Sequence, residues 1–364
     1  MQLTGILPVL PTPFTENGVD IAAMRRLVRF ALDAGVAGLV FPGFAGGGAT
    51  RQPRPRPPRR YHPPRMFSYR HGFHAGNHAD VLKHMVLIAV VKHLTAKPTA
   101  ITVVDTHAGA GLYRLDDEFA ATSGEAADGF LKLVASPLPA DPPPLVPDYL
   151  ALVASFNPAG RRRVYPGSPF ITQALLRQEP RDKLWLFELH PTDSKSLAAH
   201  VDQLHAPRQV GLKREDGFEG LRALIPPPSR RGLVLIDPSY EIKNDYGRVA
   251  ACIQESLKKF ATGTFMVWYP VIPRPEAHEL PRRLKTLANQ VGRPWLHATL
   301  NIGQSPARVA TPGEKAPRPG LTASGVFVVN PPHTLKAALQ QELPQVLEVL
   351  GRGRGQGQAV ESGG

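Results

Sequence analysis

A short acidic segment follows one of the most apolar runs of the chain. The apolar run at 232–236 leads directly into Asp-Pro-Ser-Tyr at 237–240. The carboxylate of Asp237 and the carbonyl of Pro238 can accept the two N–H bonds of an adenine N6 amine, a poor nucleophile because its lone pair is delocalised. Tyr240 can stack on the base. The same four residues also form ordinary turns, so alone they leave a base-binding site and a plain turn open.

A glycine-rich turn follows a second apolar run, at 101–105. The segment Asp-Thr-His-Ala-Gly-Ala-Gly begins at Asp105, and glycines there let a ligand approach backbone amides closely. An acidic residue that grips ribose hydroxyls is expected at the end of the next strand. The candidate is Glu188, which closes the apolar run at 184–188. A surface carboxylate is the alternative, but the apolar strand favours the ligand role.

A third acidic position is Asp216, followed by Gly217. A carboxylate after the third strand of an open α/β sheet can accept a hydrogen bond from the amino group of a cofactor's adenine. Gly217 would let the adenine ring come close. Asp is also a good residue for capping a helix N-terminus. The two roles are compatible, so both stay open.

Four histidines at 71, 74, 78 and 84 invite a metal hypothesis. The segment has no cysteine and no regular ligand spacing, so no metal is expected. These side chains more plausibly line a cap over a cofactor and nucleic-acid phosphates, with Lys83 as a phosphate contact.

The elements that must position these residues alternate between strand and helix. Helical patterns separate most of the apolar runs, which indicates a doubly wound α/β sheet. The last two strands are joined by a Pro/Gly/Arg loop and are expected to pair antiparallel. A seven-stranded, mostly parallel sheet with one antiparallel strand is the outline of a Rossmann-like class I methyltransferase. The predicted strands are 101–105, 184–188, 209–213, 232–236, 264–269, 296–302 and 325–330.

Composition limits the remaining classes. The net charge is +13, and residues 1–65 contain nine basic and three acidic residues. The rest keeps a moderate basic excess, compatible with a phosphate-rich partner. One cysteine, Cys252, excludes an internal disulfide and fits a cytoplasmic protein. There is no signal peptide and no apolar run long enough to span a membrane, so no membrane association is expected.

The chain divides into zones. Residues 1–50 have the pattern of one orphan βαβ unit, 51–65 a Pro/Arg-rich linker, and 66–350 a single domain with a helical insertion at 114–183. The Gly-rich end, 351–364, is predicted to be flexible. Residues 3–44 resemble the start of the dihydrodipicolinate synthase and N-acetylneuraminate lyase family. Since the catalytic lysine strand is missing, no lyase activity is expected.

From Met66 to about residue 350 the chain resembles the 23S rRNA (adenine-2030-N6) methyltransferases of the RlmJ family. The similarity rests on long segments such as SYRHGFHAGNHADVLKH, DTHAGAGLY, FELHP, EDGF and LVLIDPSYE. It implies S-adenosyl-L-methionine as cofactor and 23S rRNA, naked or early in assembly, as substrate. It also implies Asp237 as the catalytic acceptor and Tyr69 as an RNA contact. The cofactor contacts that it implies are His84, His107, Ser168, Glu188, Asp216 and Gly217.

The chain departs from the family at Ser239, where members usually carry a second proline. We expect reduced rather than abolished activity. The alternatives are a catalytically weakened or inactive RNA-binding homologue and a DNA adenine methyltransferase. No long exposed apolar face is evident, so a monomer is expected.

Overall fold

The computed structural model describes residues 74–115, 125–138, 142–160, 162–179, 181–304 and 320–364, together with two short strands near the N-terminus. These two strands, β1 (Phe14–Thr15) and β2 (Gly18–Val19), pair antiparallel. The chain forms two compact units, Met1–Pro64 and Arg65–Gly364. The rest of the predicted βαβ unit, the linker at 51–65 and Tyr69 lie outside the described residues.

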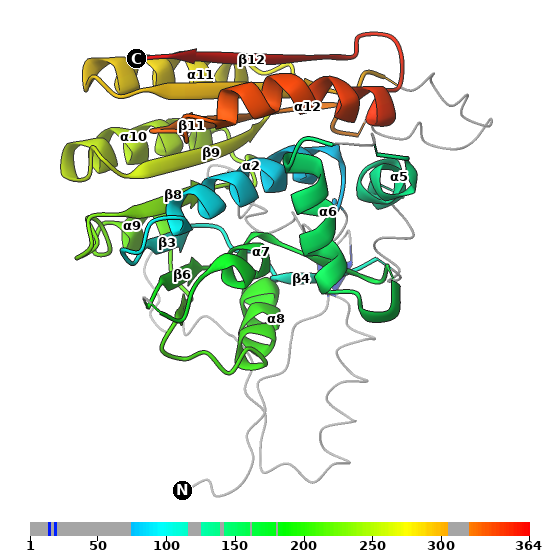
Figure 1. The fold of residues 1–364 in the computed structure, drawn as a ribbon. Helices are drawn as coiled ribbons and strands as arrows, with labels where there is room; N and C mark the ends of the chain where they lie inside the picture. Colours follow the sequence, from blue (N-terminus) through cyan, green and yellow to red (C-terminus); the bar gives the residue numbers. More distant parts are fainter. Residues whose placement is uncertain are drawn as a thin grey trace, which may run out of the picture. The chain divides into compact units, whose positions relative to one another are not determined.

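An eight-stranded sheet forms the centre of the second unit, in the order β12-β10-β11-β9-β8-β3-β6-β7 (Figure 1). Five neighbouring strands, from β9 to β7, run parallel. β11 is antiparallel to both β9 and β10, as predicted for the last two strands. All seven predicted strands are confirmed: β3 (Thr102–Asp105), β6 (Lys183–Phe187), β7 (Val210–Lys213), β8 (Gly232–Ile236), β9 (Thr264–Pro270), β10 (Trp295–Asn301) and β11 (Ala323–Val329).

The predicted flexible tail at 351–364 is wrong. Gly357–Gly363 form the edge strand β12, which pairs antiparallel with β10 along its whole length. Backbone groups make this pairing, so a segment with little apolar content can join the sheet. Gly363 also lies against the Trp295 ring, where an added Cβ would come within 2.7 Å of it. At Gly363, therefore, the glycine lets the edge strand approach the Trp295 ring closely.

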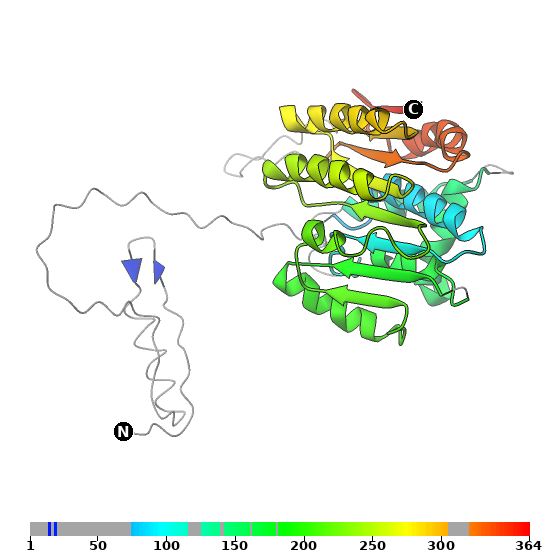
Figure 2. The same cartoon turned by 90° about the vertical axis from the view of Figure 1, so that its left-hand side faces the viewer.

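Helices cover both faces of the sheet. α10 and α11 lie on one face, and α2 and α12 on the other (Figure 2). Side chains of successive strand residues point to opposite faces of the sheet. Val103 packs in the core on the α2 side, and Val104 packs in the core on the α10 side. The helices of the two layers outside the insertion are α2 (His78–Thr95), α8 (Pro191–Asp202), α9 (Gly217–Leu221), α10 (Asn244–Lys259), α11 (Pro275–Gln290) and α12 (Leu335–Leu350).

The segment predicted as a helical insertion, 114–183, is mainly helical in its described part. A small antiparallel pair, β4 with β5, joins its beginning to its later half. α2 packs against α6 and α7 of this segment. No helix in the described residues is long and apolar enough to cross a membrane. The elements of this region are β4 (Leu112–Arg114), α4 (Glu125–Asp128), α5 (Phe130–Ala135), α6 (Leu145–Ser155), the 3-10 turn η2 (Pro158–Gly160), β5 (Val164–Pro166) and α7 (Ser168–Leu175).

Candidate functional site

The ends of β3, β6 and β8 open into one cavity of about 410 Å³. Carboxyl ends of parallel strands are where open α/β sheets bind ligands. The sequence predicts eleven catalytic, cofactor-binding or RNA-binding residues. Nine of them line this cavity, although they are spread over more than 150 positions. They are Lys83, His84, His107, Ser168, Glu188, Asp216, Gly217, Asp237 and Pro238. The sequence therefore predicted the membership of one site from separate segments of the chain.

The glycine turn after β3 holds Glu188 in place. The amide of Gly109 donates to Glu188 Oε2 at 2.7 Å, and the amide of His190 donates to Oε1 at 2.6 Å. Gly109 has φ +63°, and an added Cβ would lie 2.4 Å from the Tyr113 hydroxyl, so only glycine fits. Burial raises the pKa of Glu188. The carboxylate belongs to the cavity and not to the surface, as predicted.

Asp105 lies beneath this turn, buried at the end of β3. The Ser168 hydroxyl donates to its Oδ2 at 2.6 Å, and the His107 amide donates to its Oδ1 at 3.2 Å. Burial raises the pKa of Asp105 to about 6, against the lowering effect of these two bonds. Asp105 thus fixes two cavity residues, a role that its place in the turn sequence did not reveal.

Asp216 fills its predicted helix-cap position and also borders the cavity. It caps α9 by accepting a bond from the Phe218 amide at 2.9 Å, and it also lines the cavity. Arg248 of α10 donates to its Oδ2 at 2.6 Å. Burial alone would raise the pKa of Asp216, but the bond from Arg248 outweighs it and the pKa is lowered. Gly217 is required because a Cβ there would lie 2.0 Å from the Thr106 carbonyl oxygen.

Asp237 directly follows β8, whose five residues are all buried. Its Oδ2 accepts a bond from Lys83 Nζ at 2.8 Å, and the same ammonium lies 2.9 Å from Asp80 Oδ1. Asp80 Oδ2 in turn accepts a bond from the Gly76 amide. Burial lowers the pKa of Lys83, but the two carboxylates raise it further, and the net pKa is well above the usual value. One buried cation therefore serves two acids.

The predicted phosphate contact of Lys83 is wrong for this structure. Only 4% of Lys83 is exposed, since α2 is buried on nearly all sides between the sheet and the insertion. A phosphate of a large nucleic acid cannot reach an ammonium so placed and already paired with two carboxylates. The sequence could not show this burial, because it depends on how α2 packs against distant parts of the chain.

Tyr240 also differs from the expectation. Its ring is 2% exposed, packs on Tyr246 at a centroid distance of 4.6 Å, and does not line the cavity. The Tyr240 hydroxyl donates to the Trp268 carbonyl at 2.6 Å, and the Arg274 guanidinium donates to the Tyr240 carbonyl at 3.2 Å. The backbone there has φ +54°, which is unusual for a bulky residue. In this conformation Tyr240 holds the turn and cannot stack on a base.

Of the four histidines, His71 lies outside the described residues, and the other three have separate partners or surroundings. His74 pairs with Glu125 at 2.9 Å, and His84 bonds the Tyr165 hydroxyl at 2.8 Å. His78 is buried, which lowers its pKa to about 4. Within the described ranges, no three His, Cys, Asp or Glu side chains are grouped as metal ligands. Of these histidines, His84 lines the cavity.

The sequence missed two further residues of the cavity region, Asp80 and Arg248. Asp80 lies one helical turn before Lys83, so the i, i+3 spacing could have revealed the pair. Arg248 lies 32 residues after its partner Asp216, and no local pattern connects them. Its contribution depends on how α10 packs beside α9.

A family model described as "Ribosomal RNA large subunit methyltransferase D, RlmJ" matches residues 98–361. The chain is 40% identical over 280 residues to ribosomal RNA large subunit methyltransferase J of Escherichia coli, covering 77% of this chain and 92% of that protein. It is 38% identical over 292 residues to the Haemophilus influenzae protein of the same name, covering 78% and 94%.

A crystal structure of a Legionella pneumophila protein has the same fold. It superimposes with a TM-score of 0.66 at 30% identity, covering 80% of this chain and 98% of the other. The family model spans more than half of the chain, and both curated relatives are matched over nearly their whole length. The chain therefore belongs to the RlmJ family of ribosomal RNA large subunit methyltransferases.

Proposed function

We propose that this protein transfers a methyl group from S-adenosyl-L-methionine to the N6 atom of an adenine in 23S rRNA. The observation that carries the proposal is the position of Asp237 at the end of β8. It lines the same cavity as Glu188 and Asp216, the two carboxylates that could bind the ribose and the adenine of a nucleoside. A nucleoside cofactor and an amine acceptor would thus meet in one place.

The residues present fit the cofactor. Gly109 and Gly217 line the cavity, and an added Cβ at either position would collide with the Tyr113 hydroxyl or the Thr106 carbonyl. Glu188 would accept bonds from the ribose hydroxyls, and Asp216 from the adenine amino group. His84 of α2 and Ser168 of α7 also line the cavity. When bound, the cofactor supplies an electrophilic methyl group on a sulfonium centre.

Asp237 would orient the target amine. Lys83 occupies Oδ2, so Oδ1 and the Pro238 carbonyl are available to accept the two N–H bonds of the adenine N6. These bonds favour a pyramidal nitrogen whose lone pair is localised for attack on the methyl carbon. As the nitrogen took up the methyl group and developed positive charge, one of its protons would pass to Oδ1 of the Asp237 carboxylate.

The remaining expectations belong to the same proposal. Tyr69, outside the described residues, would contact the RNA near the target base. The basic excess after residue 65 supports a phosphate-rich substrate, either naked 23S rRNA or an early assembly form. A monomer acting in the cytoplasm is consistent with these features.

Methyl transfer from labelled cofactor tests the proposal. Purified full-length protein is incubated with unmodified 23S rRNA, with DNA or with neither, and the products are digested to nucleosides for mass spectrometry. We expect N6-methyladenosine from rRNA alone, formed at least about 100-fold more slowly by the Asp237→Ala variant. Label in DNA would establish the DNA enzyme instead, and cofactor binding without transfer would establish an inactive homologue.

The N-terminal zone is tested in the same assay. A chain that begins at Met66 should methylate rRNA at the rate of the full chain, since we propose that residues 1–65 take no part in the reaction. An insoluble or inactive Met66 chain beside an active full chain would contradict this.

A further inference from the structure

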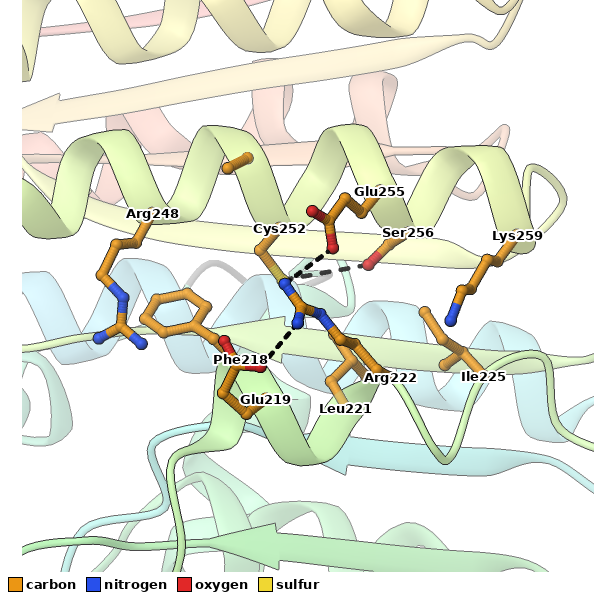
Figure 3. Close-up of a pocket in the computed structure, with 11 residues that line it drawn as sticks. Phe218, Glu219, Leu221, Arg222, Ile225, Arg248, Cys252, Glu255, Ser256 and Lys259 are labelled. Carbon is orange, nitrogen blue, oxygen red and sulfur yellow. Dashed lines mark hydrogen bonds and ion pairs between the residues drawn. The ribbon is translucent and has the colours of Figure 1, made fainter.

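A second hollow adjoins the cofactor cavity. It is a groove of about 150 Å³ between α9 and α10 (Figure 3). Its walls include the apolar side chains of Leu221 and Ile225 from the α9 side and Cys252 from α10. Arg248 lies at one end and Lys259 at the other (Figure 3). Arg248 borders both the groove and the larger cavity, so its side chain stands between them.

Two separate contacts hold Arg248 in this position. Its Nη2 donates to Asp216 Oδ2 at 2.6 Å, and its guanidinium lies over the Phe218 ring, 4.4 Å from the centroid. The Phe218 ring makes an edge contact with His107, which lines the cavity, at 4.9 Å. An ion pair and a cation–π contact thus act on the same guanidinium. Together they form a partition of fixed geometry.

We propose that Arg248 determines cofactor specificity by closing the cavity where Asp216 receives the adenine amino group. An unsubstituted amino group fits against Asp216, whereas a substituent on it meets the guanidinium. The inference rests on the proposed function, because it requires an S-adenosyl cofactor whose adenine is recognised by Asp216. Removing the Arg248 side chain would join the cavity to the apolar groove.

Arg222 provides a matched control on the same groove. Its guanidinium pairs with Glu219 at 2.7 Å and with Glu255 at 3.0 Å, and it lines the groove but not the cofactor cavity. Figure 3 shows its side chain between the two helices. Truncating Arg222 enlarges the groove and leaves the partition intact, so it separates the two effects.

The test compares binding of S-adenosylmethionine and N6-benzyl-S-adenosylmethionine by titration calorimetry. We expect the wild-type chain to prefer the natural cofactor by at least about 100-fold, a discrimination that a steric clash can supply. Arg248→Ala should bind the benzyl analogue at least about tenfold more tightly than the wild type does. It should also lose several-fold on the natural cofactor, since Asp216 is no longer held. Arg222→Ala should behave as the wild type.

Arg248→Lys keeps charge and bulk and should keep the discrimination, which guards against a misfolded alanine variant. Thermal unfolding of each variant supplies a second check. The inference is overturned if Arg248→Ala discriminates as strongly as the wild type, or if the wild type already accepts the benzyl analogue. A wild-type chain that binds neither compound would remove the proposed function and this inference with it. The two failures are therefore distinguishable.

Discussion

Two carboxylate–cation pairs line the cavity, and they differ in burial rather than in chemistry. The side chains of Lys83 and Asp237 are 5% and 15% exposed, whereas those of Arg248 and Asp216 are 36% and 32% exposed. The first pair stands at the end of β8 and the second at the start of α9. Both join an acid that would touch a ligand to a cation from a neighbouring helix.

Burial decides what each pair contributes. Breaking a buried pair leaves an uncompensated charge at low dielectric, whereas an exposed pair is screened by water and salt. The Lys83 pair should therefore be essential to the fold and to a fixed Asp237. The Arg248 pair can adjust ligand recognition at little cost to stability. The cavity thus has a buried ion pair where methyl transfer would occur and a more exposed ion pair where the cofactor would be recognised.

The largest effect is expected at the acid of the buried pair. Asp237→Ala should lower the rate of rRNA methylation by about 10²- to 10⁴-fold, as for loss of a residue that handles the reacting proton. Lys83 keeps its contact with Asp80 in this variant, so the fold should persist. Single-turnover assays measure the rate, and calorimetry should find cofactor binding nearly unchanged. Asp216→Ala should show the reverse pattern, with weaker cofactor binding, and equal losses in kcat from both variants would break the comparison.

The cations of the two pairs should differ in stability. Lys83→Met removes the ammonium that both Asp80 and Asp237 contact, and should lower the free energy of unfolding by about 3–5 kcal/mol. Arg248→Met should cost less than about 1 kcal/mol. Urea denaturation measures both.

A double variant sharpens this result. Adding Asp80→Asn to Lys83→Met removes the charge of one of the two carboxylates that lost Lys83 and should restore part of the lost stability, so the two changes are not additive. Strict additivity would mean that the loss comes from packing and not from charge.

Asp105 extends the comparison to a buried acid that contacts two cavity residues through a hydroxyl and an amide instead of a direct ion pair. Its folded-state pKa of about 6 lies above the usual 3.8. The folded state therefore holds more protons between pH 4 and 6, and the stability contributed by this group falls as pH rises through that window. Relative to the wild type, Asp105→Asn should gain on the order of 3 kcal/mol between pH 4 and 7.

Urea unfolding at pH 4, 5, 6 and 7 gives the difference curve. Asp182→Asn is the control, because bonds from Arg177 outweigh burial and lower the pKa of Asp182. Its contribution is lost only as pH falls below the ordinary range for Asp. Its difference curve should be flat across the same window, and a flat curve for Asp105→Asn as well would contradict the assigned shift.

Much of this site could be predicted because each strand and the site residues that follow it are adjacent in the sequence. The strand at 232–236 and the acid after it occur together in the sequence, and so do the glycine turn and Asp105. Parallel strands bring their carboxyl ends to one edge. The convergence of Glu188 and Asp237 therefore follows once the strand order is assigned.

Side-chain direction could not be predicted in the same way. Lys83 was expected to contact RNA phosphates and Tyr240 to stack on the target base, yet each side chain is buried. Both outcomes depend on packing between distant elements: α2 against the sheet, and the 237–240 turn against Trp268 of β9. The partition formed by Arg248 likewise requires α9 and α10 to lie side by side.

The smallest effect concerns the turn that joins the acid of the buried pair to Tyr240. Ser239 is exposed in this turn, and a proline there would fix φ near −65° and reduce the freedom of the turn. Ser239→Pro should therefore raise kcat about two- to threefold, on the scale of the 0.4–1 kcal/mol typical of such changes. Ser239→Ala removes the same hydroxyl without restricting the backbone and should leave kcat unchanged. If alanine raises kcat as much as proline does, rigidity of the turn is not the cause, and the position of Asp237 is set by Lys83 alone.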